Sequence, residues 1–341
     1  MISRLRKDNK FIYYNLWKNI PISDLHNGNI LEYLEQDLIV NQLTTKDISK
    51  FAWIVDLQWE GHSPEDIEPF RQLLIKHGVK CFGAVFTSYV DVSQLPYPAL
   101  CLVDRLIHNG QWYLNLIHQN IDWQNLPMTH NLVCLMRRPS VSRCMLANQL
   151  LNTFDSSNLV LTLGTGFVAF NEELKQLMFP RRMPLAIDGI LVDDIMQHKI
   201  NHTKFYEAPL QIIPESSSQT DKNVWHSQFI TEKTYKALSW YQFPIWYAVP
   251  GLVERVREQG FDVFDDVINH SYDLEIDPWK RMSMVVSEAR RLISLNAVQL
   301  RKDHWSRLES NADLINGIHN TAHSRHRIEI TRLKNEIQQL W

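Results

Sequence analysis

Short apolar runs alternate with longer amphipathic segments along this chain, a pattern that is typical of α/β proteins. Residues 11–17, 51–59 and 79–86 are rich in aromatic and β-branched side chains and predict three strands. Between the last two, Ser63 and Pro64 mark the start of a helix, and Gly78 stands just past its end. A strand, a helix and a second strand in this order predict a βαβ unit.

The same alternation begins again after a polar stretch at residues 118–131. Strands are predicted at residues 132–136, 159–163, 209–213 and 244–249, and helices from Val141, from Thr231 to Trp240 and over residues 251–259. From Asn296 onward the pattern predicts helix with a break near Gly317. We therefore predict two facing Rossmann-like domains and a helical extension, with limits at 1–127, 128–295 and 296–341.

The composition excludes several classes of protein. The 341 residues are 45% hydrophobic and 21% charged, which suits a chain with a large core and not a disordered or fibrous one. A net charge of −3 gives no overall attraction to nucleic acids or anionic membranes. No apolar run reaches the ~20 residues of a membrane helix, and the four cysteines lack the spacing of a disulfide framework. We expect a cytoplasmic protein without a membrane span.

The segment FITEKTYKAL, residues 229–238, places Lys233 in the first turn of a predicted helix whose expected N-cap is Thr231. A lysine at the positive end of the helix dipole is unfavourable by ~0.3–1 kcal/mol unless an anion lies nearby. Helix N-termini that follow strands in open α/β sheets commonly bind phosphate. Lys233 is therefore a candidate phosphate ligand, and a solvated surface lysine is the alternative.

Two arginines occupy the equivalent place one βα unit earlier. Arg137 and Arg138 come directly after a predicted strand and before a predicted helix. An arginine fork suits a diphosphate, and in a doubly wound sheet this loop and that of Lys233 open onto one crevice. Taken alone, the pair is better explained as surface residues, and it becomes a candidate diphosphate ligand only together with Lys233. Glu215, which follows another predicted strand, is placed to bind a hydroxyl group or to orient the arginines, with an ordinary loop acid as the alternative.

These motifs, in this order, resemble the donor half of a glycosyltransferase family found in marine bacteria and their phages. The similar segments are CLMRRP (residues 134–139), FITEKTYKAL (229–238) and FPIWYAVPGLVERVREQGFDVFDDVINHSYD (243–273). The TEK triplet is also similar to that of the α1,3-fucosyltransferase family. The resemblance implies a GT-B enzyme with two Rossmann-like domains, a nucleotide sugar held by the second one, and no required metal or other cofactor.

The resemblance also implies roles for individual residues. Glu232 matches a family glutamate that binds the donor ribose, and Lys233 matches a lysine on the donor phosphates. Arg137 matches a diphosphate-binding arginine, with Arg138 as a rival. The neighbouring nucleotide-binding candidates are Phe229, Thr231 and Glu215. Phe229 stands where the fucosyltransferases usually have tyrosine, so the donor base and sugar stay open.

A metal-independent sugar transfer needs cations for the leaving diphosphate and a base for the acceptor. Arginine, lysine and helix N–H groups stabilise the leaving group without a divalent metal, and the sequence contains no D-x-D triplet. The base is expected from the first domain, where Asp56, Glu60 and His62 come at or just beyond the end of a predicted strand. We predict Glu60 as the base, and a loop glutamate without a catalytic role is the alternative.

Three histidines near the chain's end are spaced for one helical face. His319, His323 and His326 have a spacing that suits a metal, but the arginines around them favour a solvated basic face. No metal site is therefore expected.

Three functions follow from these observations. The first is a glycosyltransferase that uses a nucleotide-diphosphate sugar and a glycan or cell-surface precursor as acceptor. The second is a phage-type DNA glycosyltransferase acting on hydroxymethylated bases, which the net charge disfavours. The third is a catalytically inactive nucleotide-binding protein. The acceptor, the stereochemical outcome and the oligomeric state stay open.

Overall fold

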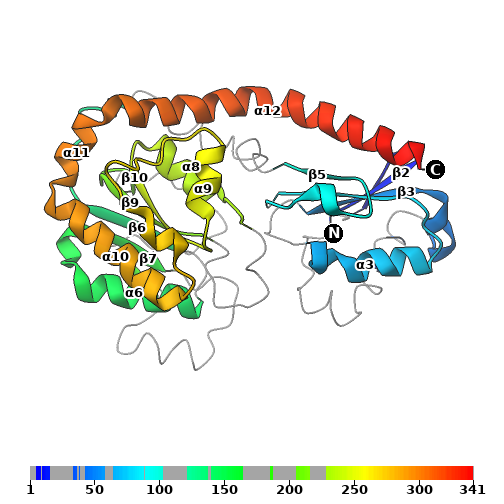
Figure 1. Ribbon diagram of the computed structural model, residues 1–341, viewed down its shortest axis with the longest axis horizontal. Coiled ribbons are helices and arrows are strands. Elements are labelled where there is room, and N and C mark those ends of the chain that lie inside the picture. Colours follow the sequence, from blue (N-terminus) through cyan, green and yellow to red (C-terminus); the bar gives the residue numbers. More distant parts are fainter. Residues whose placement is uncertain are drawn as a thin grey trace. The chain divides into compact units, whose positions relative to one another are not determined.

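A computed structural model describes residues 5–8, 10–15, 34–36, 38, 43–57, 64–87, 89–102, 121–136, 140–163, 185–186, 205–215 and 228–340. The chain divides into two compact units, Met1–Leu106 with Thr321–Trp341, and Ile107–Asn320. Each contains a five-stranded sheet with helices against it, so the predicted α/β class is confirmed (Figure 1). The sequence-based limits divide the chain differently, because the end of the last helix packs on the first sheet.

The first sheet has the order β1-β2-β3-β4-β5. The central strands β2 (Phe11–Asn15), β3 (Ala52–Leu57) and β4 (Phe82–Phe86) are the three predicted ones, and they run parallel. The edges are β1 (Leu5–Asp8), which is antiparallel to β2, and β5 (Ala99–Cys101), which is parallel to β4. The predicted helix is α3 (Pro64–Lys76), and the first unit also contains the short 3₁₀ helices η1 (Thr45–Lys50) and η2 (Val92–Gln94).

Alternate residues of β3 face opposite sides of this sheet, as strand geometry requires. Trp53 and Val55 belong to a core that includes Phe70 and Leu74 of α3. The indole Nε1 of Trp53 donates to the backbone oxygen of Ile48 at 3.1 Å, so the buried ring leaves no unpaired polar atom. This face of the sheet is therefore closed by α3.

The opposite face of the first sheet is closed by the final turns of α12 (Trp305–Gln339) (Figure 1). Ile54 shares a buried cluster with Leu333 and Ile337 of that helix. Gly83 in β4 explains how close the helix comes, because a Cβ added there would lie 2.5 Å from Cδ1 of Ile337. The glycine thus provides the space that the isoleucine fills.

The second sheet has the order β10-β9-β6-β7-β8. Strands β6 (Leu132–Met136) and β7 (Leu159–Leu163) match their predicted bounds, and β9 (Leu210–Pro214) and β10 (Phe243–Tyr247) lie within two residues of theirs. These four are parallel, and β8 (Leu185–Ala186) is an antiparallel edge. The chain moves from β6 outward to β7 and later to β9 on the other side, so the switch point of the sheet lies between β6 and β9.

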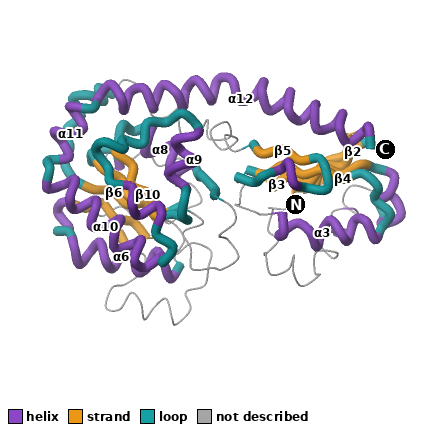
Figure 2. The backbone as a smooth tube through the Cα atoms, in the orientation of Figure 1, coloured by secondary structure: helices purple, strands orange, loops and turns teal. Residues whose placement is uncertain are grey.

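Helices lie on both faces of the second sheet. The helices α6 (Val141–Thr153) and α10 (Pro278–Ser294) lie side by side, joined by a 3.3 Å hydrogen bond from Gln149 to Ser283, and α8 (Glu232–Ser239) lies on the other face (Figure 2). The remaining elements are α9 (Leu252–Glu258), α11 (Ala297–Asp303), η3 (Ser156–Asn158) and η5 (His270–Leu274). The arrangement is consistent with a two-domain Rossmann-like protein.

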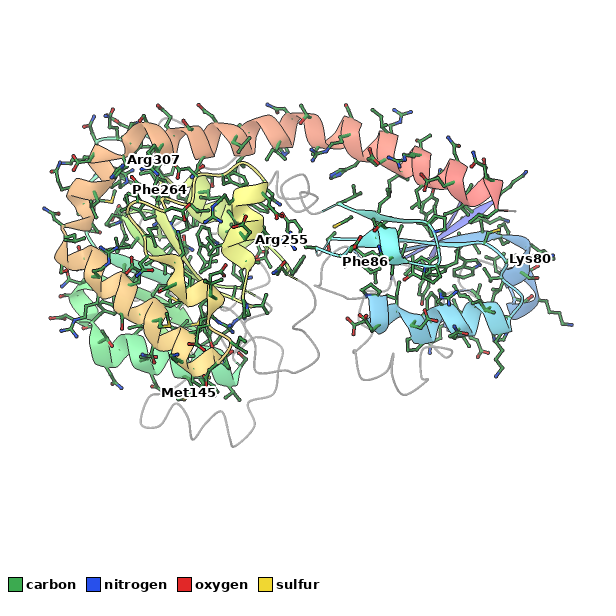
Figure 3. All side chains as sticks on the ribbon, viewed as in Figure 1. Lys80, Phe86, Met145, Arg255, Phe264 and Arg307 are labelled. Carbon is green, nitrogen blue, oxygen red and sulfur yellow. The ribbon has the colours of Figure 1, made fainter. Side chains whose placement is uncertain are left out.

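The predicted helix break near Gly317 is wrong, because α12 runs through this residue without interruption. Glycine costs a helix about 1 kcal/mol relative to alanine, and the contacts of α12 on either side outweigh that cost. On the second unit, Arg307 binds both Asp262 and Asp266 and lies 4.9 Å from the ring centre of Phe264 (Figure 3).

Aromatic packing holds the start of α12. The ring of Trp305 stacks on Tyr241, with 4.7 Å between ring centres and 10° between ring planes. The buried Arg301 lies over the same indole and donates to the backbone oxygens of Tyr241 and Trp123. Trp305 is thus a packing residue. No helix among the described residues is long and apolar enough to cross a membrane.

Candidate functional site

The first turn of α8 lies at the carboxyl edge of the second sheet, after β9 and next to the switch point between β6 and β9. Thr231 is the N-cap, as predicted, and its Oγ1 accepts a hydrogen bond from the backbone N–H of Lys233. The apolar face of the helix is buried through Ala237 and Leu238. The buried face anchors the helix, so Glu232 and Lys233 are held at this edge.

A fully buried carboxylate, that of Glu215, organises the beginning of α8. Its Oε1 accepts from the backbone N–H of Thr231 at 3.0 Å and from Oγ1 of Thr234 at 2.6 Å. Its Oε2 accepts from Oγ1 of Thr231. Thr234 Oγ1 in turn accepts from the indole Nε1 of Trp246 in β10 at 3.0 Å. The carboxylate therefore connects the end of β9 to the helix start, and the threonine connects both to β10.

Lys233 is part of the same network. Its Nζ donates to Oγ1 of Thr231 at 2.8 Å and lies 3.6 Å from Oε2 of Glu215, and the side chain is 19% exposed. The Glu232 carboxylate is 3.9 Å away and 34% exposed. The anion that offsets a lysine at a helix N-terminus is thus present within the protein. The sequence suggested that Glu215 binds a hydroxyl group or orients the arginines. In the structure it contacts Thr231, Thr234 and Lys233.

The structure adds one cation that the sequence analysis did not single out. Arg143, in the first turn of α6, is only 9% exposed, and its Nη2 lies 3.5 Å from the backbone oxygen of Pro214, the residue before Glu215. The sequence signal was present, because an arginine three residues after the N-cap Ser140 stands in the first turn of a helix that follows β6. Arg137 and Arg138 stand closer to the end of β6 in the sequence than Arg143 does.

Some of the other predicted site residues lie within the described ranges and some lie outside them. Arg137, Arg138 and Glu60 lie outside the described residues. Phe229 is buried in the core of the second unit. Asp56 is half-buried in β3, one residue from the end of that strand.

The predicted basic face of the last helix is described in part. Arg325 and Arg327 are exposed, as expected for a solvated face, whereas His326 is buried. Among the residues that the structure describes, no three histidine, cysteine, aspartate or glutamate side chains are grouped to hold a metal ion.

A cavity of about 640 Å³ opens at the carboxyl side of β10, within the second unit. It is lined by Gln228, three residues before the N-cap of α8, and by residues of α9 and η5, among them Arg255 (Figure 3). The amide of Gln228 donates to the Pro250 oxygen at 3.0 Å and accepts from Nε of Arg255 at 2.6 Å. Gly251 has φ +80°, and a Cβ there would lie 2.5 Å from the Gln228 amide nitrogen, so glycine shapes this wall.

Another wall of the cavity contains Ser271 and Asp273 of the SYD triplet, together with His270. Asp273 accepts from the backbone N–H of Val253 at 3.1 Å, which closes the start of α9, and burial raises its pKa to about 6. The hydroxyl oxygen of Tyr272 lies 2.9 Å from Nδ1 of His270. Nε2 of His270 lies 2.7 Å from the backbone oxygen of Val263. Burial lowers the pKa of His270, which favours the neutral ring. This wall is preorganised by hydrogen bonds within the protein.

No family model matches this chain, and no curated protein or solved structure is significantly similar to it.

Proposed function

We propose that this protein is a metal-independent glycosyltransferase of the GT-B type that binds a nucleotide-diphosphate sugar at the carboxyl edge of the second sheet. One observation carries the proposal: the first turn of α8 presents Glu232 and Lys233 beside the switch point of a parallel sheet. Ligands of open α/β sheets bind in that crevice, and helix N–H groups there favour phosphate.

The cations of this edge suit a diphosphate. Lys233 stands at this edge in the first turn of α8. The buried Arg143 extends from α6, on the other side of the switch point, to the end of β9. Arg137 and Arg138 directly follow β6 in the sequence and are assigned to the same anion. Two or more fixed cations stabilise the charge that develops on a leaving nucleoside diphosphate.

The nucleoside is assigned to the space between α8 and the cavity beside α9. Glu232 supplies an acceptor for ribose hydroxyl groups, and the cavity lies within the ~300–1,000 Å³ range of small-molecule sites. Thr231 and Glu215 hold the helix start rather than the ligand. Phe229, which is buried, supports the same segment from within the core.

The proposed acceptor is the hydroxyl group of a glycan or cell-surface precursor, and the proposed base is Glu60 of the first unit. The base takes the proton of the attacking hydroxyl while the sugar's bond to the diphosphate oxygen breaks. The released nucleoside diphosphate keeps the bonding electrons, and its negative charge is stabilised by the cations of the second unit.

Calorimetry with nucleoside diphosphates and the matching nucleosides tests this proposal. The wild type should bind at least one diphosphate, and Lys233→Met should weaken that binding about 10- to 100-fold while the nucleoside affinity stays unchanged. Glu232→Ala should weaken both. A wild type that binds none of the common nucleoside diphosphates would refute the proposal.

A second measurement separates an enzyme from an inactive binding protein. Slow hydrolysis of the bound nucleotide sugar, lost in Glu60→Gln, supports a transferase that uses this base. Binding without any hydrolysis or transfer supports the inactive alternative.

A further inference from the structure

The network around Glu215 has the composition of an anion site whose anion is a side chain. A carboxylate with no exposed surface takes a backbone N–H, two threonine hydroxyl groups and a lysine ammonium at the start of one helix. These are the groups that bind a phosphate at a helix N-terminus. The Lys233 ammonium, which would bind a ligand phosphate, is thus already in contact with a protein carboxylate.

We propose that Glu215 is an internal counter-anion that competes with ligand phosphate for Lys233 and so sets the affinity of this site for anions. The inference rests on the proposed function for the statement that phosphate comes to Lys233. What the inference adds is the direction in which Glu215 changes phosphate affinity. The carboxylate weakens phosphate binding, although it holds the binding segment in place.

The geometry determines that sign. Nζ of Lys233 is 3.6 Å from Oε2 of Glu215 and 2.8 Å from Oγ1 of Thr231, so part of its hydrogen-bonding capacity is directed into the protein. A phosphate on the outer side of the ammonium would stand roughly 6–7 Å from the carboxylate. At an effective dielectric constant near 20, the repulsion between two unit charges at that distance corresponds to at least a tenfold loss of affinity.

The contacts also explain how one residue can stabilise the fold and weaken binding. Oε1 of Glu215 holds the helix start through the backbone N–H of Thr231 and the hydroxyl of Thr234, whereas Oε2 accepts from the Thr231 hydroxyl and faces Lys233. Glu215→Gln keeps an oxygen for the first task and replaces the second oxygen by a neutral amide nitrogen. The amide nitrogen can only donate to Thr231 Oγ1, which reverses the bond that the carboxylate accepts there, and it no longer attracts the ammonium.

The test uses inorganic pyrophosphate as the probe, because it carries the anion without a nucleoside. Glu215→Gln should bind pyrophosphate about 10-fold more tightly than the wild type while its melting temperature falls. The control is Glu288→Gln, which also removes a buried carboxylate of the second unit that is paired with an arginine, Arg291. It should leave pyrophosphate affinity unchanged.

The double variant Glu215→Gln/Lys233→Met identifies the partner. If Glu215 acts through Lys233, the gain in affinity disappears in the double variant, because residues that share one partner couple. A gain that persists without the lysine overturns the proposal, and so does a folded Glu215→Gln protein that binds pyrophosphate equally well or more weakly. The second result would show a purely structural carboxylate.

A measurement on the wild type keeps the proposal falsifiable if Glu215→Gln does not fold. In ¹⁵N-lysine-labelled protein, the Lys233 ammonium resonance, assigned with Lys233→Met, should shift on addition of pyrophosphate as the ammonium gains a phosphate partner on the side away from Glu215. No shift at saturating pyrophosphate overturns the proposal. Failure of the proposed function is a separate result, because it is read from nucleoside diphosphate against nucleoside binding by the wild type.

Discussion

Replacing Thr234 by valine tests whether the network around Glu215 holds the second unit together. Valine has nearly the shape of threonine, so the change removes a hydroxyl group and leaves the packing in place. That hydroxyl donates to Glu215 at 2.6 Å and accepts from the Trp246 indole at 3.0 Å. Both partners are buried, so water does not replace the lost bonds.

The magnitude follows from the two bonds. A hydrogen bond to a charged group contributes about 1.5–3 kcal/mol, and a buried donor without a partner costs about 1–3 kcal/mol. Together they predict a loss of about 3–5 kcal/mol in the free energy of unfolding of the second unit. Thr234→Ser is the matched control, because it keeps the hydroxyl and loses one methyl group, at about 0.5–1.5 kcal/mol.

The assay is native-state hydrogen exchange read by mass spectrometry on peptides from β9 and β10. A loss of about 3–5 kcal/mol accelerates exchange through global opening by two to three orders of magnitude or more. Peptides from β3 and β4 report the first unit and serve as the internal reference. Exchange in Thr234→Val that matches Thr234→Ser would refute the reasoning, because it would mean that the two bonds contribute nothing measurable.

Three further outcomes are expected. Gly83→Ala should lower the free energy of unfolding of the first unit by about 1–3 kcal/mol in urea, because the new Cβ meets Ile337. The double variant Gly83→Ala/Ile337→Ala should lose less stability than the two single variants added together, because the smaller side chain removes the clash. Asp273 has a folded-state pKa of about 6 against an ordinary 3.8, so the folded protein binds this proton more tightly than the unfolded chain. Its contribution to stability should therefore grow as pH falls through 6 toward 4, and unfolding of the wild type relative to Asp273→Asn should show that trend. Ser271→Trp should block the cavity and weaken nucleoside binding measured by calorimetry, whereas Ser310→Trp, on an exposed position of α12, should not; equal affinities for both variants would contradict the cavity assignment.

The repeating parts of the fold were predictable from the sequence because their signals are local. Strands β6 and β7 were predicted to the residue, since each is a five-residue apolar run between polar segments. Thr231 was predicted as N-cap from the residues that follow it. The edge strands β1, β5 and β8 were missed because two to four residues leave too little periodicity to detect.

The candidate site was predictable in its position but not in its contacts. The order of strands and helices placed Lys233 at a carboxyl edge. The partner of Lys233 could not be found from the sequence, because Glu215 stands 16 residues before Thr231 and meets the helix start only in the folded chain. Arg143 was missed for a similar reason, since an arginine within a helix shows its direction only after α6 packs on the sheet.

The division of α12 between the two units has a consequence for how the protein is made. One face of the first sheet is completed by Leu333 and Ile337, which are synthesised after the whole second unit, whereas Ile54 and Val85 on that face are synthesised before it. During translation this face stays uncovered while the whole second unit is being made, and uncovered apolar surface is where chains aggregate. A chaperone that binds nascent chains should therefore hold this protein until the turns of α12 that carry Leu333 and Ile337 emerge, and release should coincide with docking of Ile337 against Gly83.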